Sequence, residues 1–180
     1  MEAKDHLLLG RYLLADRGIP PEDPRSKRFL QGIVWPDINV LTYIAGHTFR
    51  DSFIFIAPKI KRLHKINNWD LRDFFECGKV FHYLADYFTF PHNDTFRGGL
   101  RKHRAYEREL HLIFETFLAK YKPPKKANPQ DLVAMVEKYH DVYEKQSPSI
   151  KNDCRYIAAV SFLAISAVMP KAKLRLILAA

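Results

Sequence analysis

The sequence predicts an all-α protein that folds as a single-domain bundle of several helices. Hydrophobic residues recur at three- and four-residue spacing over long stretches. No strand-length alternation, hairpin dipeptide or internal repeat interrupts these stretches. Prolines and a pair of glycines divide them into pieces of helix length. The chain of 180 residues fits one domain, 1–180, which is large enough to bury a core without disulfides.

Two helical stretches precede a corner that contains proline. Asp5 is placed to cap the first helix, which ends at Gly18. Ser26 opens a second, short helix that runs through Gly32. This helix must end before Trp35-Pro36-Asp37, because the residue before a proline is pushed out of the α region. We therefore expect Asp37 on a non-helical corner, a place where functional side chains are often held.

The middle of the chain contains one apolar segment and one long helix. The segment 42–66 is interrupted by Pro58 and has a single histidine, His47, in an apolar setting. Taken alone, such a histidine is typical of a buried, hydrogen-bonded side chain. The long helix that follows is capped near Asn68 or Asp70, and an apolar stripe runs along it. This stripe indicates the helix side that faces the core.

Three further helices complete the predicted bundle. Pro91 ends the long helix, and the glycine pair 98–99 precedes a helix over residues 100–120. A helix then starts near Pro129 with Asn128 as its cap. The last helix begins after Pro148 and continues to Met169. Its apolar window stops short of the roughly 20 residues that span a bilayer, so we expect a buried helix.

Charge and cysteine content limit the class of protein. The net charge of +9 favours anionic partners, which include nucleic acid, phospholipid headgroups and phosphorylated small molecules, without choosing among them. The two cysteines, Cys77 and Cys154, lie far apart within expected helices, which is typical of small core residues. No apolar signal segment opens the chain, so we expect a cytoplasmic protein.

The stretch from His82 to Glu107 contains the clearest chemical pattern. His82 with Asp86, and His103 with Glu107, are four residues apart, so each pair faces one side of a helix. Imidazole and carboxylate with room for water are typical of a catalytic metal site. The same spacing also occurs in solvated pairs and in buried, hydrogen-bonded histidines. His92 follows in the loop after the long helix.

Two other histidines have an acid four residues on. His111 precedes Glu115, and His140 precedes Glu144. Because ordinary surface pairs have this spacing, we interpret both as exposed pairs on helices. His111 also shares a helix line with His103, which leaves a role as a partner of a metal ligand open.

Ligand-type residues follow one another in a characteristic order. This order comprises His6, Asp37, His47, His82, Asp86, His92, His103 and Glu107. The central pattern, His-x3-Asp-x5-His followed by His-x3-Glu, resembles the zinc-dependent phospholipase C family and its relatives, the P1-type nucleases. These are all-helical enzymes with up to three zinc ions. The resemblance covers roughly residues 6 to 107.

The resemblance implies three groups of zinc ligands. The first group is Asp37, His47, His82 and Asp86. The second group is His92, His103 and Glu107. A third zinc shares Asp86 with His6. In secreted members that zinc also takes the amine and carbonyl of a terminal tryptophan, whereas this chain opens on Met1. We therefore expect two zinc ions, and a third that is weakly held because a flexible segment 1–5 loses entropy on ordering.

The resemblance also implies a reaction. We expect a metal-dependent hydrolase of phosphate esters, specifically a phospholipase C-like phosphodiesterase that uses a zinc-activated water. Asp37 is the expected catalytic residue, which orients or deprotonates that water. The partner is an anionic phosphate ester, a phospholipid headgroup or nucleic acid. A P1-type nuclease acting on single-stranded nucleic acid and a non-catalytic metal-binding helical protein are the alternatives.

Overall fold

The computed structural model describes residues 1–39, 48–124 and 131–169, and within these ranges the protein is helical without any strand. The prediction of an all-α fold is confirmed. The helices are α1 (Ala3–Arg17), α2 (Pro24–Ile38), α4 (Phe49–Lys65), α5 (Leu71–Asp86), α6 (Leu100–Lys120), α7 (Leu132–Glu144) and α8 (Ile150–Val168). A 3₁₀ turn, Phe90–His92, follows α5.

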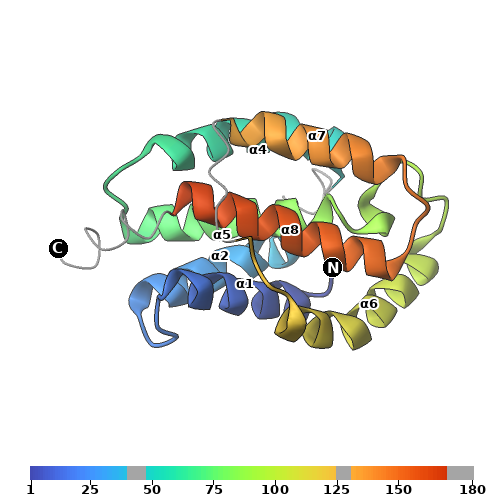
Figure 1. Ribbon diagram of the computed structural model, residues 1–180, viewed down its shortest axis with the longest axis horizontal. Helices are drawn as coiled ribbons and strands as arrows, with labels where there is room; N and C mark the ends of the chain where they lie inside the picture. Colours follow the sequence, from blue (N-terminus) through green and yellow to red (C-terminus); the bar gives the residue numbers. More distant parts are fainter. Residues whose placement is uncertain (40–47, 125–130, 170–180) are drawn as a thin grey trace.

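Helices α5 and α8 form the centre of the bundle. Helices α4 and α7 pack on one side of this pair, and α1 and α2 pack on the other side (Figure 1). Helix α6 crosses one end and contacts both α1 and α8. This arrangement places the ends of α2 and α5 and the beginnings of α1 and α6 within reach of one another.

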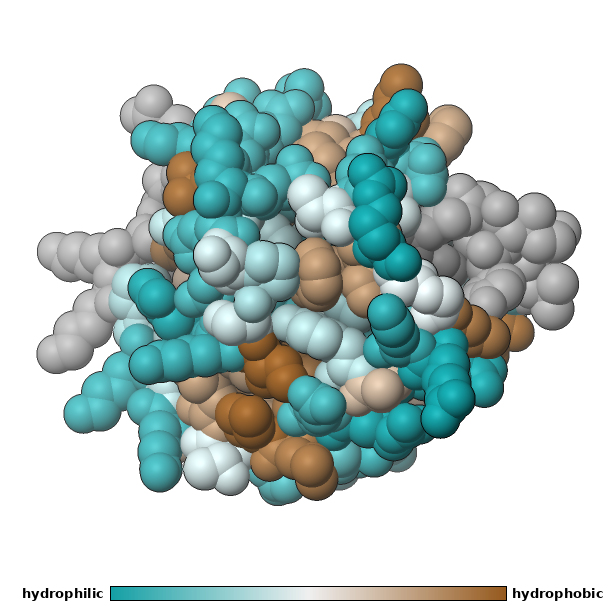
Figure 2. Space-filling model, turned by 90° about the vertical axis from the view of Figure 1, so that its right-hand side faces the viewer, coloured by the Kyte–Doolittle hydropathy of each residue, from teal (hydrophilic) through white to brown (hydrophobic). Residues whose placement is uncertain are grey.

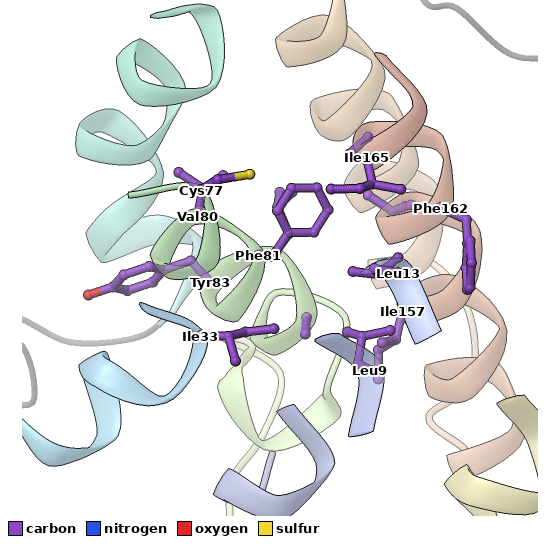
Figure 3. Packing of buried hydrophobic residues seen from close by; sticks show 14 of the residues in the cluster. Leu9, Leu13, Ile33, Cys77, Val80, Phe81, Tyr83, Ile157, Phe162 and Ile165 are labelled. Carbon is purple, nitrogen blue, oxygen red and sulfur yellow. The ribbon is translucent and has the colours of Figure 1, made fainter. Parts of the chain in front are cut away.

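The core lies between the two central helices and α1. Phe81 points from α5 toward Phe162 and Ile165 of α8, while Leu9 of α1 lies beside Ile157 (Figure 3). All five side chains are buried. Cys77 and Cys154 are buried, free thiols, as predicted. In the part of the chain that the structure describes, no helix has the length and hydrophobicity needed to cross a membrane.

Helices α2 and α5 approach each other closely because glycines face the contact. A Cβ added at Gly32 would overlap the carbonyl oxygen of Phe75, and one added at Gly78 would overlap the carbonyl oxygen of Phe29. Any larger side chain at either position would push the two backbones apart. The close contact brings the end of α2, with Asp37, to the end of α5.

The predicted bounds of α2 were wrong at both ends. Asp23 caps the helix through the backbone amide of Arg25, so α2 begins before Ser26. The helix also runs through Pro36. A proline in a helix interior costs about 3 kcal/mol, and here the packing of α2 on α5 offsets that cost. Asp37 therefore lies in the last helical turn and not on a non-helical corner.

The other helices agree more closely with the sequence prediction. Helix α4 continues through Pro58, which sits on its exposed side, so the predicted interruption is wrong. Asp70 caps α5 in a reciprocal pair with Asp73, as one of the two predicted caps. Helix α6 has the predicted bounds. Helix α7 is capped by Asp131, whereas the predicted cap and start at 128–129 lie outside the described residues.

Helix α1 ends as predicted but begins differently. Gly18 has φ 75° and closes the helix in the left-handed conformation that glycine adopts readily. Asp5 does not cap the helix, since α1 begins at Ala3 and the Asp5 side chain bonds elsewhere. The first residues of the chain are therefore ordered against α5 and α6.

One end of the molecule combines polar and apolar surface. This end, on the right in Figure 1, is mostly hydrophilic, and hydrophobic residues gather toward the bottom, the side on which α6 lies (Figure 2). Among the large hydrophobic residues that are exposed, α6 contributes Leu100, Leu112 and Ile113. This end therefore offers both charged and apolar contacts.

Candidate metal centre

The last turn of α5 places His82 and Asp86 together in the interior. His82 Nε2 lies 3.1 Å from Asp86 Oδ2, and both side chains are buried. His82 Nδ1 lies 2.9 Å from the carbonyl oxygen of Ile33 on α2. Because a carbonyl only accepts hydrogen bonds, the imidazole proton resides on Nδ1. The Nε2 lone pair then faces the cluster, which is the orientation that a metal ligand needs.

Asp86 presents its two oxygens to different neighbours. Oδ2 faces His82, whereas Oδ1 lies 3.2 Å from His6 Nε2 and 3.8 Å from His92 Nε2. Burial by itself raises the pKa of Asp86, but the neighbouring imidazoles and the amino terminus outweigh burial and hold it well below its usual range. The carboxylate is therefore ionised and connects two groups of nitrogen donors.

His6 enters the cluster from the first turn of α1. It is fully buried, and its ring stacks on the His82 ring with 4.0 Å between centroids. Neither ring nitrogen makes a hydrogen bond to another described residue. Burial and the nearby His82 lower the pKa of His6 to about 3, so the imidazole is neutral. A neutral buried imidazole without a hydrogen bond is well suited to coordinate a metal ion.

Asp37 lies at the open edge of this group. Its Oδ1 is 3.7 Å from His82 Nε2, and 32% of its side chain is exposed. Burial of the remainder raises the pKa of Asp37 to about 6. His6, Asp37 and His82 can each offer one ligand atom within 4.8 Å of the others. Asp37 is thus the member of this group that solvent reaches.

The 3₁₀ turn and α6 supply a second group of donors. His92 Nε2 lies 3.3 Å from Glu107 Oε1, and His103 Nε2 lies 2.9 Å from the same oxygen. Ligand atoms of all three residues lie within 4.8 Å of one another. Burial raises the pKa of Glu107, but its bonds to His103 and His92 outweigh that effect and hold it far below its usual range. The carboxylate is therefore ionised.

The amine of Met1 lies between the two groups. It is 2.7 Å from Asp86 Oδ1, 2.9 Å from Glu107 Oε1 and 3.3 Å from His92 Nε2. Burial lowers the pKa of this amine, yet the two carboxylates outweigh burial and raise it to about 11. The expectation of a flexible opening segment was wrong, because Met1 is buried. A positive charge is therefore stabilised where the carboxylates and imidazoles converge.

All predicted ligand residues that the structure describes converge in this centre. They are His6, Asp37, His82, Asp86, His92, His103 and Glu107. The eighth, His47, lies outside the described residues. Imidazole nitrogens and carboxylate oxygens with one exposed edge are the donor set of a catalytic zinc site. The residues therefore fit zinc.

Two histidines that were predicted to form exposed helix pairs contact distant segments of the chain. His111 Nδ1 lies 2.6 Å from Asp5 Oδ1 on α1, and this contact replaces the expected pair with Glu115. His140 keeps its predicted neighbour, since Nδ1 lies 3.8 Å from Glu144 Oε2, but the histidine is buried and its Nε2 lies 2.8 Å from Asn93 Oδ1. The contacts with Asp5 and Asn93 join segments that are distant in sequence, so helical spacing gave no indication of them.

Asp153 bonds to the turn that carries His92 beside the candidate metal centre, and the sequence analysis did not predict this role. Its carboxylate accepts hydrogen bonds from the backbone amide of Phe90 at 2.8 Å, from the Tyr106 hydroxyl at 2.9 Å and from the Tyr143 hydroxyl at 2.8 Å. Asp153 is fully buried. Asp153 lies in the polar first turn of α8, between Lys151 and Arg155, where acids are common at helix starts, so the sequence had no signal that set it apart. The carboxylate fixes the turn that carries His92.

Comparison with known proteins identifies the family. Neither curated proteins nor solved structures give a match to this chain. The family model described as zinc-dependent phospholipase C matches residues 5–162, which include every residue of the centre except Met1. The helical fold and the converging histidines and carboxylates agree with that match. The chain therefore belongs to the zinc-dependent phospholipase C family.

Proposed function

We propose that this protein hydrolyses the phosphodiester bond of phospholipid headgroups in a metal-dependent reaction. The observation that carries the proposal is the convergence of two donor groups on Asp86, one from α1 and α5 and one from the 3₁₀ turn and α6. A buried carboxylate with imidazoles at both of its oxygens is an arrangement that a pair of neighbouring cations would satisfy. Family membership supports the same class of reaction.

The metal ligands are assigned in three groups. One zinc would be held by Asp37, His47, His82 and Asp86. A second would be held by His92, His103 and Glu107. A third would be held by His6 and by Asp86, which it would share with the first. The contacts among the described members of each group support these assignments. Asp86 is the shared ligand, because its two oxygens face His82 and His6 separately.

Asp37 is assigned as the catalytic base. Zinc, when bound, supplies Lewis acidity that acidifies water and polarises phosphoryl oxygens. Asp37 lies at the exposed edge of the donor group, so a water and a substrate phosphate can reach its carboxylate. The carboxylate accepts the proton of the water that attacks phosphorus. As the water oxygen bonds to phosphorus, the bond from phosphorus to the glycerol oxygen breaks, and the departing oxygen takes a proton from solvent water at the open edge of the centre.

The surroundings of the centre favour a lipid over a nucleic acid. Ile38 follows Asp37 directly and is 65% exposed, and Leu100 precedes His103 by one helical turn and is 56% exposed. Exposed aliphatic side chains next to ligand residues in the sequence suit the acyl region of a lipid. Phospholipid is therefore the first substrate to test. Trp35, two residues before Asp37, is 39% exposed and offers a ring for base stacking, so single-stranded nucleic acid is the second substrate to test.

The test compares three substrates with the same zinc-loaded protein. Phosphatidylcholine in mixed micelles, a chromogenic phosphodiester and single-stranded DNA are incubated with the parent and with Asp37→Asn. We expect release of phosphocholine by the parent. We expect turnover to fall by about 100-fold or more in Asp37→Asn, because a general base contributes that much. Asp141→Asn, an exposed acid on α7, serves as the control with unchanged turnover.

Two results would overturn the proposal. One is the absence of phosphocholine release by protein with a full metal complement, measured by elemental analysis. The other is hydrolysis of single-stranded DNA at a higher kcat/KM than that of the phospholipid, which would identify a nuclease.

A further inference from the structure

We propose that Glu2, Asp5 and His111 form a separate site for a divalent metal ion, beside the candidate metal centre and distinct from it. Each of these residues can offer one ligand atom within 4.8 Å of the others. Glu2 and Asp5 come from the beginning of α1, and His111 comes from α6. None of them belongs to the three ligand groups assigned above. We call this set the α1–α6 site.

The Asp5 carboxylate is the strongest sign that the site takes a ligand. The side chain is fully buried, and Oδ1 lies 2.6 Å from His111 Nδ1. The other oxygen, Oδ2, is buried and has no hydrogen-bond partner among the described residues. A buried carboxylate oxygen without a partner is costly. A cation held between Asp5 and its neighbours would satisfy that oxygen.

The two other residues leave the site open to solvent. His111 is 32% exposed and Glu2 is 28% exposed, so water can complete the coordination shell. Glu2 Oε2 lies 2.9 Å from the ammonium of Lys4, which is 56% exposed. An exposed pair of this kind contributes little to stability. The lysine can therefore move aside, or Glu2 can use its other oxygen, when a cation binds.

Asp5 and His6 are adjacent in sequence, but their side chains point to different clusters. Consecutive residues of an α-helix point about 100° apart around its axis. Asp5 therefore reaches His111, whereas His6 reaches Asp86. On α6, His111 lies one turn beyond Glu107 on the same side of the helix, so there the two clusters are separated along the helix axis. Two separate clusters are thus built from neighbouring turns of the same two helices.

The donor set selects a type of cation. One imidazole and two carboxylates suit first-row divalent ions such as Mn²⁺ and Zn²⁺, and they lack the thiolates of structural zinc sites. With three protein ligands, two of them partly exposed, the site should hold its ion less tightly than the central ligands hold theirs. A weak ion of this kind would leave on dialysis against a mild chelator.

The test counts bound ions in the parent and in His111→Asn. An asparagine amide can still donate to Asp5 through its nitrogen, which does not bind a metal ion, and its oxygen then points away from the Asp5 carboxylate. Each protein is equilibrated with Zn²⁺ or, separately, with Mn²⁺, and the ions per chain are measured by elemental analysis. We expect His111→Asn to bind one ion fewer than the parent. Glu115→Gln, one turn further along α6 and exposed, should retain the parent count.

Two further measurements keep this test independent of the proposed function. In Asp86→Asn the central ions weaken, and addition of His111→Asn should still remove one more ion. Circular dichroism confirms that the variants are folded. An equal ion count in the parent and in His111→Asn, for both metals, would overturn the α1–α6 site whether or not the protein hydrolyses phospholipid. Failure to hydrolyse phospholipid with the ion difference intact would overturn only the proposed function.

Discussion

Two buried aspartates contact the same 3₁₀ turn, and the protein surrounds them in opposite ways. Asp153 contacts the amide of Phe90 and two tyrosine hydroxyls, which are neutral donors. Asp86 contacts the imidazoles of His6 and His82 and the amine of Met1. Both carboxyls are shielded from water. Neutral donors alone satisfy the Asp153 carboxylate, whereas the Asp86 carboxylate also contacts a charged amine.

The difference has an electrostatic consequence. Burial raises the pKa of Asp153 to about 6 despite its three hydrogen bonds. For Asp86 burial acts in the same direction, but imidazoles and the amine outweigh it, and its pKa lies well below the usual range. A buried carboxylate that neutral donors satisfy is a structural tie. A buried carboxylate among imidazoles is a place where positive charge binds.

We expect the largest difference between the two aspartates in the response to zinc. Zinc at about 1,000 times its Kd should raise the free energy of unfolding of the parent by about 4 kcal/mol, because it binds only the folded state. Asp153→Asn should retain this increase, and Asp86→Asn should lose most of it. Urea unfolding with zinc and with chelator measures both. Equal zinc stabilisation of the two variants would refute the distinction.

The next largest expected effect is a difference between Asp86 and Glu107 in how many zinc ions each substitution weakens. Asp86→Asn should weaken two ions by about 100-fold each, or about 2.7 kcal/mol, because both of its oxygens face ligand nitrogens. Glu107→Gln should weaken mainly one ion, since only Oε1 contacts His92 and His103. Calorimetric zinc titration gives the sites and affinities. Loss of the same single ion in both variants would show that Asp86 does not bridge.

Asp153→Asn should affect stability and leave the ions in place. An amide cannot accept all three hydrogen bonds, and we expect a loss of about 2 kcal/mol. The parent should also lose stability as pH rises from about 4 to about 6, because its folded state holds the Asp153 proton more tightly than the unfolded state does. Urea unfolding across this range should show a smaller slope for the variant. An unchanged slope would contradict the assignment.

The smallest expected effect tests a single donor to Asp153. Tyr106→Phe removes one of its two phenol hydrogen bonds and should lower the free energy of unfolding by about 1 kcal/mol. The hydroxyl of Tyr139 makes no hydrogen bond to a described residue, so Tyr139→Phe is a matched control. Thermal unfolding compares the two. A larger loss in Tyr139→Phe would show that packing, and not the bond to Asp153, determines the result.

The sequence by itself determined the features that depend on one turn of helix. His82 with Asp86, and His103 with Glu107, were predicted from four-residue spacing, and each pair is in contact. Asp70 caps the beginning of α5 and Gly18 caps the end of α1, as the capping preferences of Asp and Gly predict. Such features involve residues whose distance is fixed by helical geometry alone. No knowledge of the bundle is needed to place them.

Only the tertiary structure decided the contacts between distant segments. Asp5 meets His111 across 106 positions of sequence, and His140 meets Asn93 across 47. Helix α2 runs through Pro36 because its packing on α5 exceeds the local preference to stop. Preferences of single residues amount to a few kcal/mol at most, whereas helix packing buries many side chains together. The helices α1 and α6, which contribute to the candidate metal centre and to the proposed α1–α6 site, were therefore predictable one by one, and their contact with each other was not.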